Sequence, residues 1–334
     1  MRDTAFAGSN ARIRVYESQL LQNDQFERML QANSFEEAAR VLRDTPYRND
    51  VDELLETRDY DELLSKELQR VYDEMFSLSP DPALVELFSL RYTYHNLKVL
   101  FKARMTGENF DSMLIPIGKN PMSDYRQAVE IGKSDELDQA YIDSIQEVLV
   151  AEEEYHSIQS VDIILDRRYF THLRWLAEKI DDREIIDFVK YYIDLNNLST
   201  LSRAIKKRKN RNFLVTILSS SGNIPKETLV ELGKESLETA GKLLSEGPFA
   251  SIVQDSLDPE THELSPVKVD LETDNAIMDK MKEAKLQPFG ALPLLAFIHA
   301  KETEVKNLRM IFAGKENNLP IESVRERMRM NYGS

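Results

Sequence analysis

One helical phrase occurs three times in the sequence at domain-length intervals, and this repeat constrains the fold more than any other feature. Each copy contains an Asn-Leu pair, and the asparagines are Asn96, Asn197 and Asn307. They lie 101 and 110 residues apart. Apolar residues stand twelve, nine and two positions before each asparagine, and again one and four positions after it. Because these positions fall on one face of an α-helix, the sequence predicts three related amphipathic helices.

The repeat continues beyond each helix into a polar turn that contains glycine and then into a proline, at Pro121, Pro225 and Pro320. Proline suits the first turn of a helix, where its missing N–H is not needed. Each repeat is therefore expected to be a long helix, a stop and a proline-started helix. A period of about 100 residues has the size of a domain, not of a short solenoid unit. The expected helical modules are residues 1–114, 115–218 and 219–334.

Composition favours an all-α fold. Glycine and proline are scarce, with 11 and 12 among 334 residues, and no alternating apolar pattern runs for long. One exception, Pro266–Leu271, alternates and predicts a short strand or an extended linker. Three related modules can pack around a pseudo-three-fold axis or in a row, and the repeat is compatible with both. The expected helices cover about residues 11–31, 35–42, 59–77, 82–105, 135–155, 162–179, 183–208, 291–313 and 325–329.

Several functional classes are disfavoured by composition. The chain contains no cysteine, so disulfides and cysteine-ligated metals are excluded. No apolar stretch approaches the ~18 residues that a membrane-spanning helix needs, and Met1–Phe6 lacks the apolar run of a signal peptide. The formal net charge of −15 disfavours broad binding to nucleic acids or anionic lipids. We therefore expect a cytoplasmic protein with no membrane span and no nucleic-acid partner.

Residues suited to catalysis or metal binding form no convincing motif. Five histidines are scattered without metal-ligand spacing, and no glycine-rich phosphate loop is present. Asp181-Asp182 resembles an acidic Mg²⁺-diphosphate motif, but its place directly before the second repeat helix favours helix capping. The carboxylates of Glu152–Glu154 point in different directions on a helix, which favours a solvated face over a metal site. Trp175 is expected to be a core or inter-helix anchor. No catalytic residue, metal or cofactor is predicted.

A basic segment follows the second repeat helix, with five cationic residues in six: Lys206, Lys207, Arg208, Lys209 and Arg211. Cations stabilise a helix C-terminus through the helix dipole, so the simplest interpretation is a solvated helix end. The alternative is a docking patch for an acidic partner or for lipid headgroups.

The distributed features of the chain resemble the C subunit of bacterial and archaeal V/A-type rotary ATPases, whose eukaryotic counterpart is the d subunit. The resemblance covers essentially the whole chain, and its motifs are structural rather than catalytic. It rests on Asn10–Arg14 with Glu17 and Leu20-Leu21, on the Thr45-Pro46-Tyr47 stop after the Phe35-Glu36-Glu37 helix, on the three Asn-Leu helices and on the basic C-terminal helix.

The resemblance implies an all-helical protein of three similar domains, arranged around a pseudo-three-fold axis as a funnel. It implies a non-catalytic central-stalk component of a V-type rotary ATPase. Such a component is a socket that receives the foot of the central rotor shaft, sits on the membrane proteolipid ring and transmits torque for ion transport. The protein would then be peripheral on the inner face of the cell membrane, and no homo-oligomer is expected.

The basic ends of the repeat helices are candidate partner-binding residues, because the implied pseudo-symmetry would bring them into a ring near one mouth of the funnel. These candidates are Arg104, Lys206, Lys207, Arg208, Lys209, Arg211 and Lys315. Two alternatives stay open. One is a helical protein-binding scaffold unrelated to a rotary motor. The other is a Mg²⁺-dependent all-α enzyme that uses Asp181 and Asp182, in which Asp181→Asn would abolish turnover.

Overall fold

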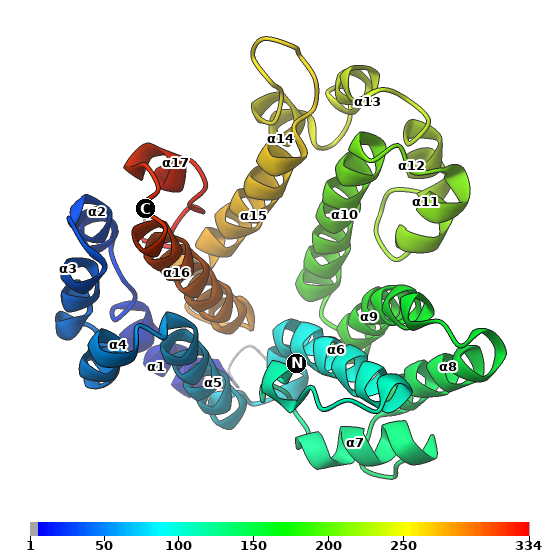
Figure 1. The fold of residues 1–334 in the computed structure, drawn as a ribbon, viewed down its shortest axis with the longest axis horizontal. Coiled ribbons are helices and arrows are strands. Elements are labelled where there is room, and N and C mark those ends of the chain that lie inside the picture. The colour runs from blue at the N-terminus through cyan, green and yellow to red at the C-terminus, as the bar shows by residue number, and fades with distance from the viewer. Residues whose placement is uncertain (1–5, 334) are drawn as a thin grey trace. The chain divides into compact units, whose positions relative to one another are not determined.

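The computed structural model describes residues 6–333, and these residues form seventeen α-helices and no β-strand (Figure 1). The all-α prediction is therefore confirmed. The sequence prediction that Met1–Phe6 is not a signal peptide concerns residues that lie almost entirely outside the described range, which begins at Phe6. The three repeat helices are found as predicted, at α6 (Pro82–Thr106), α10 (Arg183–Lys206) and α16 (Leu292–Glu316).

Internal contacts divide the described chain into two compact units. One is Ser89–Thr273, and the other joins the described residues before Ser89 to those after Thr273. The boundaries fall within α6 and within α15 (Pro266–Lys282). They do not coincide with the module boundaries expected from the repeat, and the division into three modules stays a prediction.

The Ser89–Thr273 unit is built around pairs of packed helices. Helix α8 packs along α9, and α9 also contacts α10 and α11. The end of α10 packs with the following short helices in an apolar cluster that includes Leu201, Ile205, Leu214 and Leu229. Besides parts of α6 and α15, the unit contains α7 (Met122–Ile131), α8 (Gln139–Tyr155), α9 (Ile158–Ile180), α10, α11 (Arg211–Ile217), α12 (Lys226–Leu232), α13 (Leu237–Leu244) and α14 (Ala250–Asp255).

An aromatic cluster fills the core between α6, α8 and α9. The ring centroids of Tyr141 and His172 lie 4.4 Å apart, and those of Tyr94 and His172 lie 5.9 Å apart. The Tyr94 hydroxyl lies 2.9 Å from Ser144 Oγ and 3.2 Å from His172 Nδ1. Burial lowers the pKa of His172 to about 3, because a charged imidazole would lose its hydration. The histidine is therefore a neutral core residue at physiological pH.

In the other unit, helices from both ends of the chain share one core around α16. Helices α1, α2, α3, α5 and α17 all contact α16, and nearly every side chain in its first half is buried. The unit contains α1 (Ala7–Glu17), α2 (Asn23–Gln31), α3 (Phe35–Arg40), α4 (Val51–Thr57), α5 (Tyr60–Leu78), α16 and α17 (Ile321–Arg325), with short 3₁₀ turns at Val41–Asp44, Pro46–Asp50 and Glu283–Leu286.

A buried ion cluster crosses this core. Lys301 Nζ lies 3.1 Å from Glu67 Oε1 and 2.7 Å from Glu304 Oε1. The Tyr47 hydroxyl donates to Glu304 Oε1 at 2.7 Å, and Arg70 pairs with Glu67 at 2.8 Å. Burial opposes the charged form of Lys301, but the carboxylates of Glu304 and Glu67 raise its pKa overall. The lysine is therefore charged, and its charge is balanced by its neighbours.

Two sequence predictions about secondary structure are wrong. Pro266–Leu271 begins α15 instead of forming a strand or linker: Val269 is buried and its N–H donates to Ser265 O, whereas Val267 faces solvent. The basic C-terminal helix ends at Arg325 as part of α17, before Arg327 and Arg329. In both places the apolar or charged pattern is short, so tertiary packing overrides it.

Two further predictions need correction. The helix expected over residues 11–31 is divided into α1 and α2 by an irregular segment at residues 18–22. Trp175 is not a core anchor, since its side chain is 36% exposed and the ammonium group of Lys179 lies 4.8 Å from its ring centroid. This indole therefore lies at the surface of α9, where a cation–π contact covers it in part.

Candidate partner-binding site

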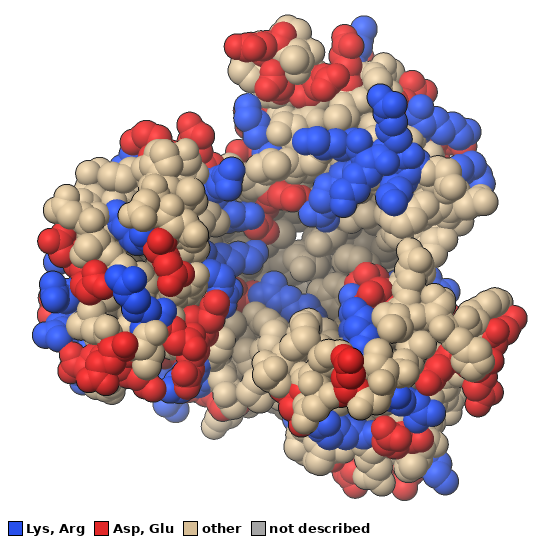
Figure 2. Space-filling view, viewed as in Figure 1, with Lys and Arg blue, Asp and Glu red and all other residues tan. Residues whose placement is uncertain are grey.

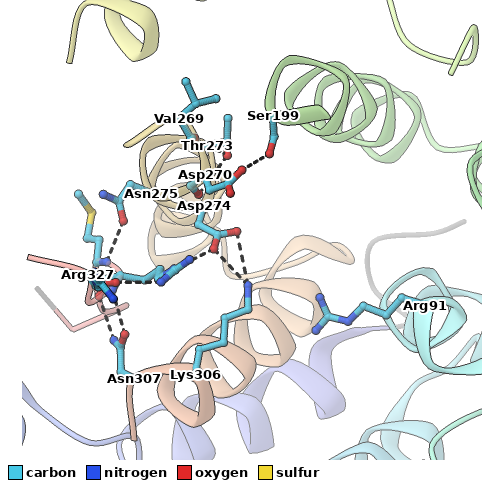
Figure 3. Close-up of polar contacts among 12 residues, drawn as sticks. Arg91, Ser199, Val269, Asp270, Thr273, Asp274, Asn275, Lys306, Asn307 and Arg327 are labelled. Carbon is cyan, nitrogen blue, oxygen red and sulfur yellow. Dashed lines mark hydrogen bonds and ion pairs between the residues drawn. The ribbon is translucent and has the colours of Figure 1, made fainter. Parts of the chain in front are cut away.

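The repeated asparagines fix the chain segments that follow their helices. The side-chain amide of Asn197 donates to Ser219 O and accepts from Ser219 N, both at 2.9 Å. Asn96 makes the same pair of bonds to Ile115, at 2.6 and 2.8 Å. Asn307 binds Arg329 in the same way, with both bonds at 2.9 Å. Figure 3 shows the Asn307 side chain with its hydrogen bonds. We call these three contacts the asparagine anchors. They explain why asparagine recurs in each repeat.

An acidic residue three positions before the asparagine of α10 and of α16 binds a segment that leads into another helix. The Asp194 carboxylate accepts from the backbone N–H groups of Asn223 and Ile224, at 2.9 and 3.1 Å. In α16 the corresponding Glu304 accepts from Leu21 N at 2.7 Å. Asp194 and Glu304 are both buried. The apolar stripe of the repeat does not include this position, so the sequence pattern gives no signal for it.

The backbone of Leu21 thus contacts α16 as the backbone of Ile224 contacts α10. Ile224 precedes Pro225, the N-cap of α12, and Leu21 precedes Gln22, the N-cap of α2. The segments that lead into α2 and α12 are therefore held in the same way, by a carboxylate of α16 and of α10. Pro121, Pro225 and Pro320 are the N-caps of α7, α12 and α17, so the proline-started helix predicted after each repeat helix is confirmed. The third copy differs in order, since Pro320 comes before the anchored Arg329, whereas Pro225 follows the anchored Ser219.

Two of the candidate partner-binding residues are engaged inside the fold. Arg104 Nη1 donates to the carbonyl oxygens of Val129 and Glu130 at the end of α7, both at 3.2 Å. Lys315 Nζ donates to the carbonyl oxygens of Leu30 and Ala32 at the end of α2, at 2.5 and 2.6 Å. A cation there satisfies carbonyls that have no partner within their own helix. Both side chains therefore have a structural role.

The remaining candidates lie together and exposed where α10 meets α11. They are Lys206, Lys207, Arg208, Lys209 and Arg211, and we call them the basic corner. Figure 2 shows Lys and Arg side chains gathered over the C-terminal end of α10. Within the basic corner, Arg211 lies 3.9 Å from Glu231, and Lys209 Nζ lies 4.9 Å from the Phe213 ring centroid. The other three cations have no ion pair among residues 6–333.

Asp181 and Asp182, the acidic pair of the alternative enzyme hypothesis, lie between two helices and form their ends. Asp182 is the N-cap of α10, and its carboxylate accepts from Ile185 N at 3.2 Å. Asp181 ends α9 with a positive φ of 55°. The capping interpretation is therefore confirmed for Asp182. In the described part of the chain, no group of three or more histidine or acidic side chains is arranged to hold a metal ion.

A groove in the unit that contains α16 is polar and carries balanced charge. It has a volume of about 1050 Å³. It is lined by residues in and around α2, by the 3₁₀ turns Val41–Asp44 and Pro46–Asp50, and by α5. Arg28 and Arg48 line this groove, but so do Asp24, Asp44 and Asp50. The groove therefore has no dominant charge and assigns no ligand class.

Comparison with known proteins identifies the family. The model of the ATP synthase (C/AC39) subunit family matches residues 9–327. The chain belongs to this family. It is 33% identical to the C subunit of the V-type sodium ATPase of Enterococcus hirae, over 97% of this chain and 98% of that protein. It is 26% identical to the C subunit of the A-type ATP synthase of Methanocaldococcus jannaschii, over 96% and 85% of the two chains.

The same comparison confirms the resemblance recognised in the sequence. The C subunit of the A-type ATP synthase of Archaeoglobus fulgidus is 26% identical, over 97% of this chain and 96% of that protein. The family members are structural components of rotary ATPases, not the catalytic ones. Among residues 6–333, no helix is both long and apolar enough to cross a membrane.

Proposed function

We propose that this chain is the central-stalk socket of a V/A-type rotary ATPase, coupling the rotating shaft to the membrane proteolipid ring. The observation that carries the proposal is the family match over residues 9–327, which leaves few residues outside the shared fold. In this role the chain catalyses nothing itself. It passes torque from the subunits that hydrolyse or make ATP to the ring that carries ions.

The internal construction supports this role. A part that transmits torque must resist shear, because motion absorbed within it does not reach the next part. Each long repeat helix is tied by its asparagine to a segment about twenty residues later, through two hydrogen bonds. Close-packed cores and satisfied polar networks deform little. The anchors thus stiffen both units, and the Lys301 ion cluster adds to the stiffness of the unit that contains α16.

The socket role also defines location and partners. The partners are the rotor-shaft subunits and the proteolipid ring, and the chain lies at the cytoplasmic face of the cell membrane through these contacts. It works as one copy in each ATPase and does not form homo-oligomers. The ion is a property of the ring, so the sodium in the name of the Enterococcus hirae relative is not transferred to this chain.

The test is reconstitution of the two predicted contacts. The purified chain is mixed with purified rotor-shaft subunits of the same organism, and separately with the detergent-solubilised proteolipid ring, and each mixture is analysed by size exclusion. The expected result is a one-to-one complex with the shaft and co-migration with the ring. If neither complex forms at low and moderate salt, the socket role is wrong, and a scaffold for other proteins becomes the better proposal.

A further inference from the structure

The three repeat helices end differently, and the difference singles out α10. Eight residues after their asparagines, α6 carries Arg104 and α16 carries Lys315, and each binds carbonyl oxygens of a neighbouring helix. The corresponding residue of α10 is Ile205, which is buried in an apolar cluster. The cations of this repeat therefore come one to six residues later, and in the described part of the chain none of their side chains donates to a backbone carbonyl of a neighbouring helix.

Hydrogen bonds fix the shape of the basic corner. The backbone N–H of Arg208 donates to Ile205 O at 2.9 Å, and that of Lys209 donates to Ala204 O at 3.0 Å. Arg208 has a φ of 49°, the left-handed conformation that often ends a helix. Asn210 then caps α11 by accepting from Phe213 N at 2.9 Å. Two rigid helices thus hold the cationic side chains around one tight turn.

The charge of the basic corner contrasts with the rest of the chain. The whole sequence has a formal net charge of −15, yet this segment carries five cations in six residues. An acidic partner is repelled by most of such a surface and attracted to the exception, which orients it during encounter. Because Lys206, Lys207 and Arg208 are exposed without an intramolecular ion pair among the described residues, they can meet carboxylates of a partner without first breaking a contact.

We propose that the basic corner is a docking surface for an acidic face of the rotor-shaft subunits. This inference rests on the proposed socket function and assigns one of its contacts. A lipid surface is a poorer fit, since stable interfacial binding combines basic charge with apolar side chains that enter the bilayer. The aromatic residue at the corner, Phe213, is partly buried and lies under the Lys209 ammonium group. A contact of solvated charges also suits two partners that are both stable in water before assembly.

The test compares two charge-reversal variants with the same change in net charge. The first is Lys206→Glu/Lys207→Glu/Arg208→Glu in the basic corner. The matched control reverses three exposed cations elsewhere that have no ion pair in the described chain: Arg40→Glu/Arg48→Glu/Lys133→Glu. A neutral variant, Lys206→Gln/Lys207→Gln/Arg208→Gln, separates lost attraction from new repulsion. Binding to purified rotor-shaft subunits is measured by titration at several salt concentrations, after thermal unfolding has shown that each variant is folded.

The expected result is a loss of affinity of roughly tenfold or more for the reversed corner at low salt, a smaller loss for the neutral variant, and near-normal affinity for the control. The salt dependence of binding should fall in both corner variants. Unchanged shaft binding by the reversed corner overturns the inference while leaving the socket role intact. Loss of binding only to vesicles with anionic lipid, or only to the proteolipid ring, also overturns it. If the unaltered chain binds neither shaft nor ring, the socket role fails and this inference fails with it.

Discussion

The side-chain amide of Asn197 and the backbone of Ser219 exchange two hydrogen bonds, both 2.9 Å long. This pairing matches donor to acceptor and acceptor to donor, as one residue pair does between neighbouring β-strands. Both residues are buried, so the Asn197 amide and the Ser219 backbone cannot form hydrogen bonds with water if the partner is lost. The anchor therefore converts one helical side chain into a specific attachment point for a segment 22 residues away.

Replacing Asn197 should lower stability markedly. Asn197→Ala leaves the N–H and C=O of Ser219 buried without partners, and each such group costs about 1–3 kcal/mol. Asn197→Asp should be no better, because a carboxylate accepts from the N–H but cannot donate to the carbonyl. Urea unfolding at constant slope measures both changes. Asn196→Ala is the matched control, since Asn196 bonds within its own helix to Tyr192 O. Equal stability of the Asn197 and Asn196 variants would refute the anchor.

Breaking the buried ion cluster from one side should be costly. Lys301→Met leaves Glu67 and Glu304 without the cation between them, and removal of one partner from a buried pair typically costs about 3–5 kcal/mol. Adding Glu304→Gln removes one of the uncompensated charges, so the double variant should be more stable than the sum of the two single losses predicts. A double-mutant cycle by chemical denaturation checks this expectation, and strict additivity would argue against direct coupling.

Stability should fall in mild acid because of His172. Burial depresses the folded-state pKa of His172 to about 3, below the ordinary value of 6.5. Above pH 6.5 the imidazole is neutral in both states. As pH falls from 6.5 toward 3 the unfolded state binds a proton that the folded state does not, so this group lowers stability by up to about 1.4 kcal/mol per pH unit.

The variant His172→Gln tests this pH dependence. Its free energy of unfolding, measured between pH 7 and 4, should fall less steeply than that of the unaltered chain by about one proton. Tyr94→Phe removes the hydroxyl near Nδ1 but keeps the imidazole, so its slope should stay steep. The same slope in all three proteins would show that His172 does not titrate differently on folding.

Lys315 should matter for stability and not for assembly. Lys315→Met removes the donor to the carbonyls of Leu30 and Ala32, for an expected loss of about 1–2 kcal/mol. The exposed substitution Lys207→Met should change stability by no more than about 0.5 kcal/mol. Thermal or urea unfolding compares the two variants, and titration with the rotor shaft compares their binding. Weakened shaft binding by the Lys315 variant at unchanged stability would contradict this assignment.

Sequence reasoning succeeded where the signal is local and periodic. The helices α6, α10 and α16 were predicted within a few residues, because a buried stripe repeats every three to four residues along each. The capping role of Asp182 followed from its place before α10. The sequence also predicts that Lys206–Arg211 are exposed, because so many neighbouring positive charges cannot be buried without counter-ions. Each conclusion needed only residues that are neighbours in the chain.

The tertiary structure alone decided which distant groups each of these residues meets. Ile115, Ser219 and Arg329 share no side-chain type, because the asparagines bind their backbone, which every sequence provides. The roles of Arg104 and Lys315 depend on helix ends that lie at least 25 residues away. By itself the sequence determined the helices, the repeated asparagine and the isolated basic charge. Packing decided the anchors and the partners of those cations, since contacts between distant segments depend on geometry that no local pattern encodes.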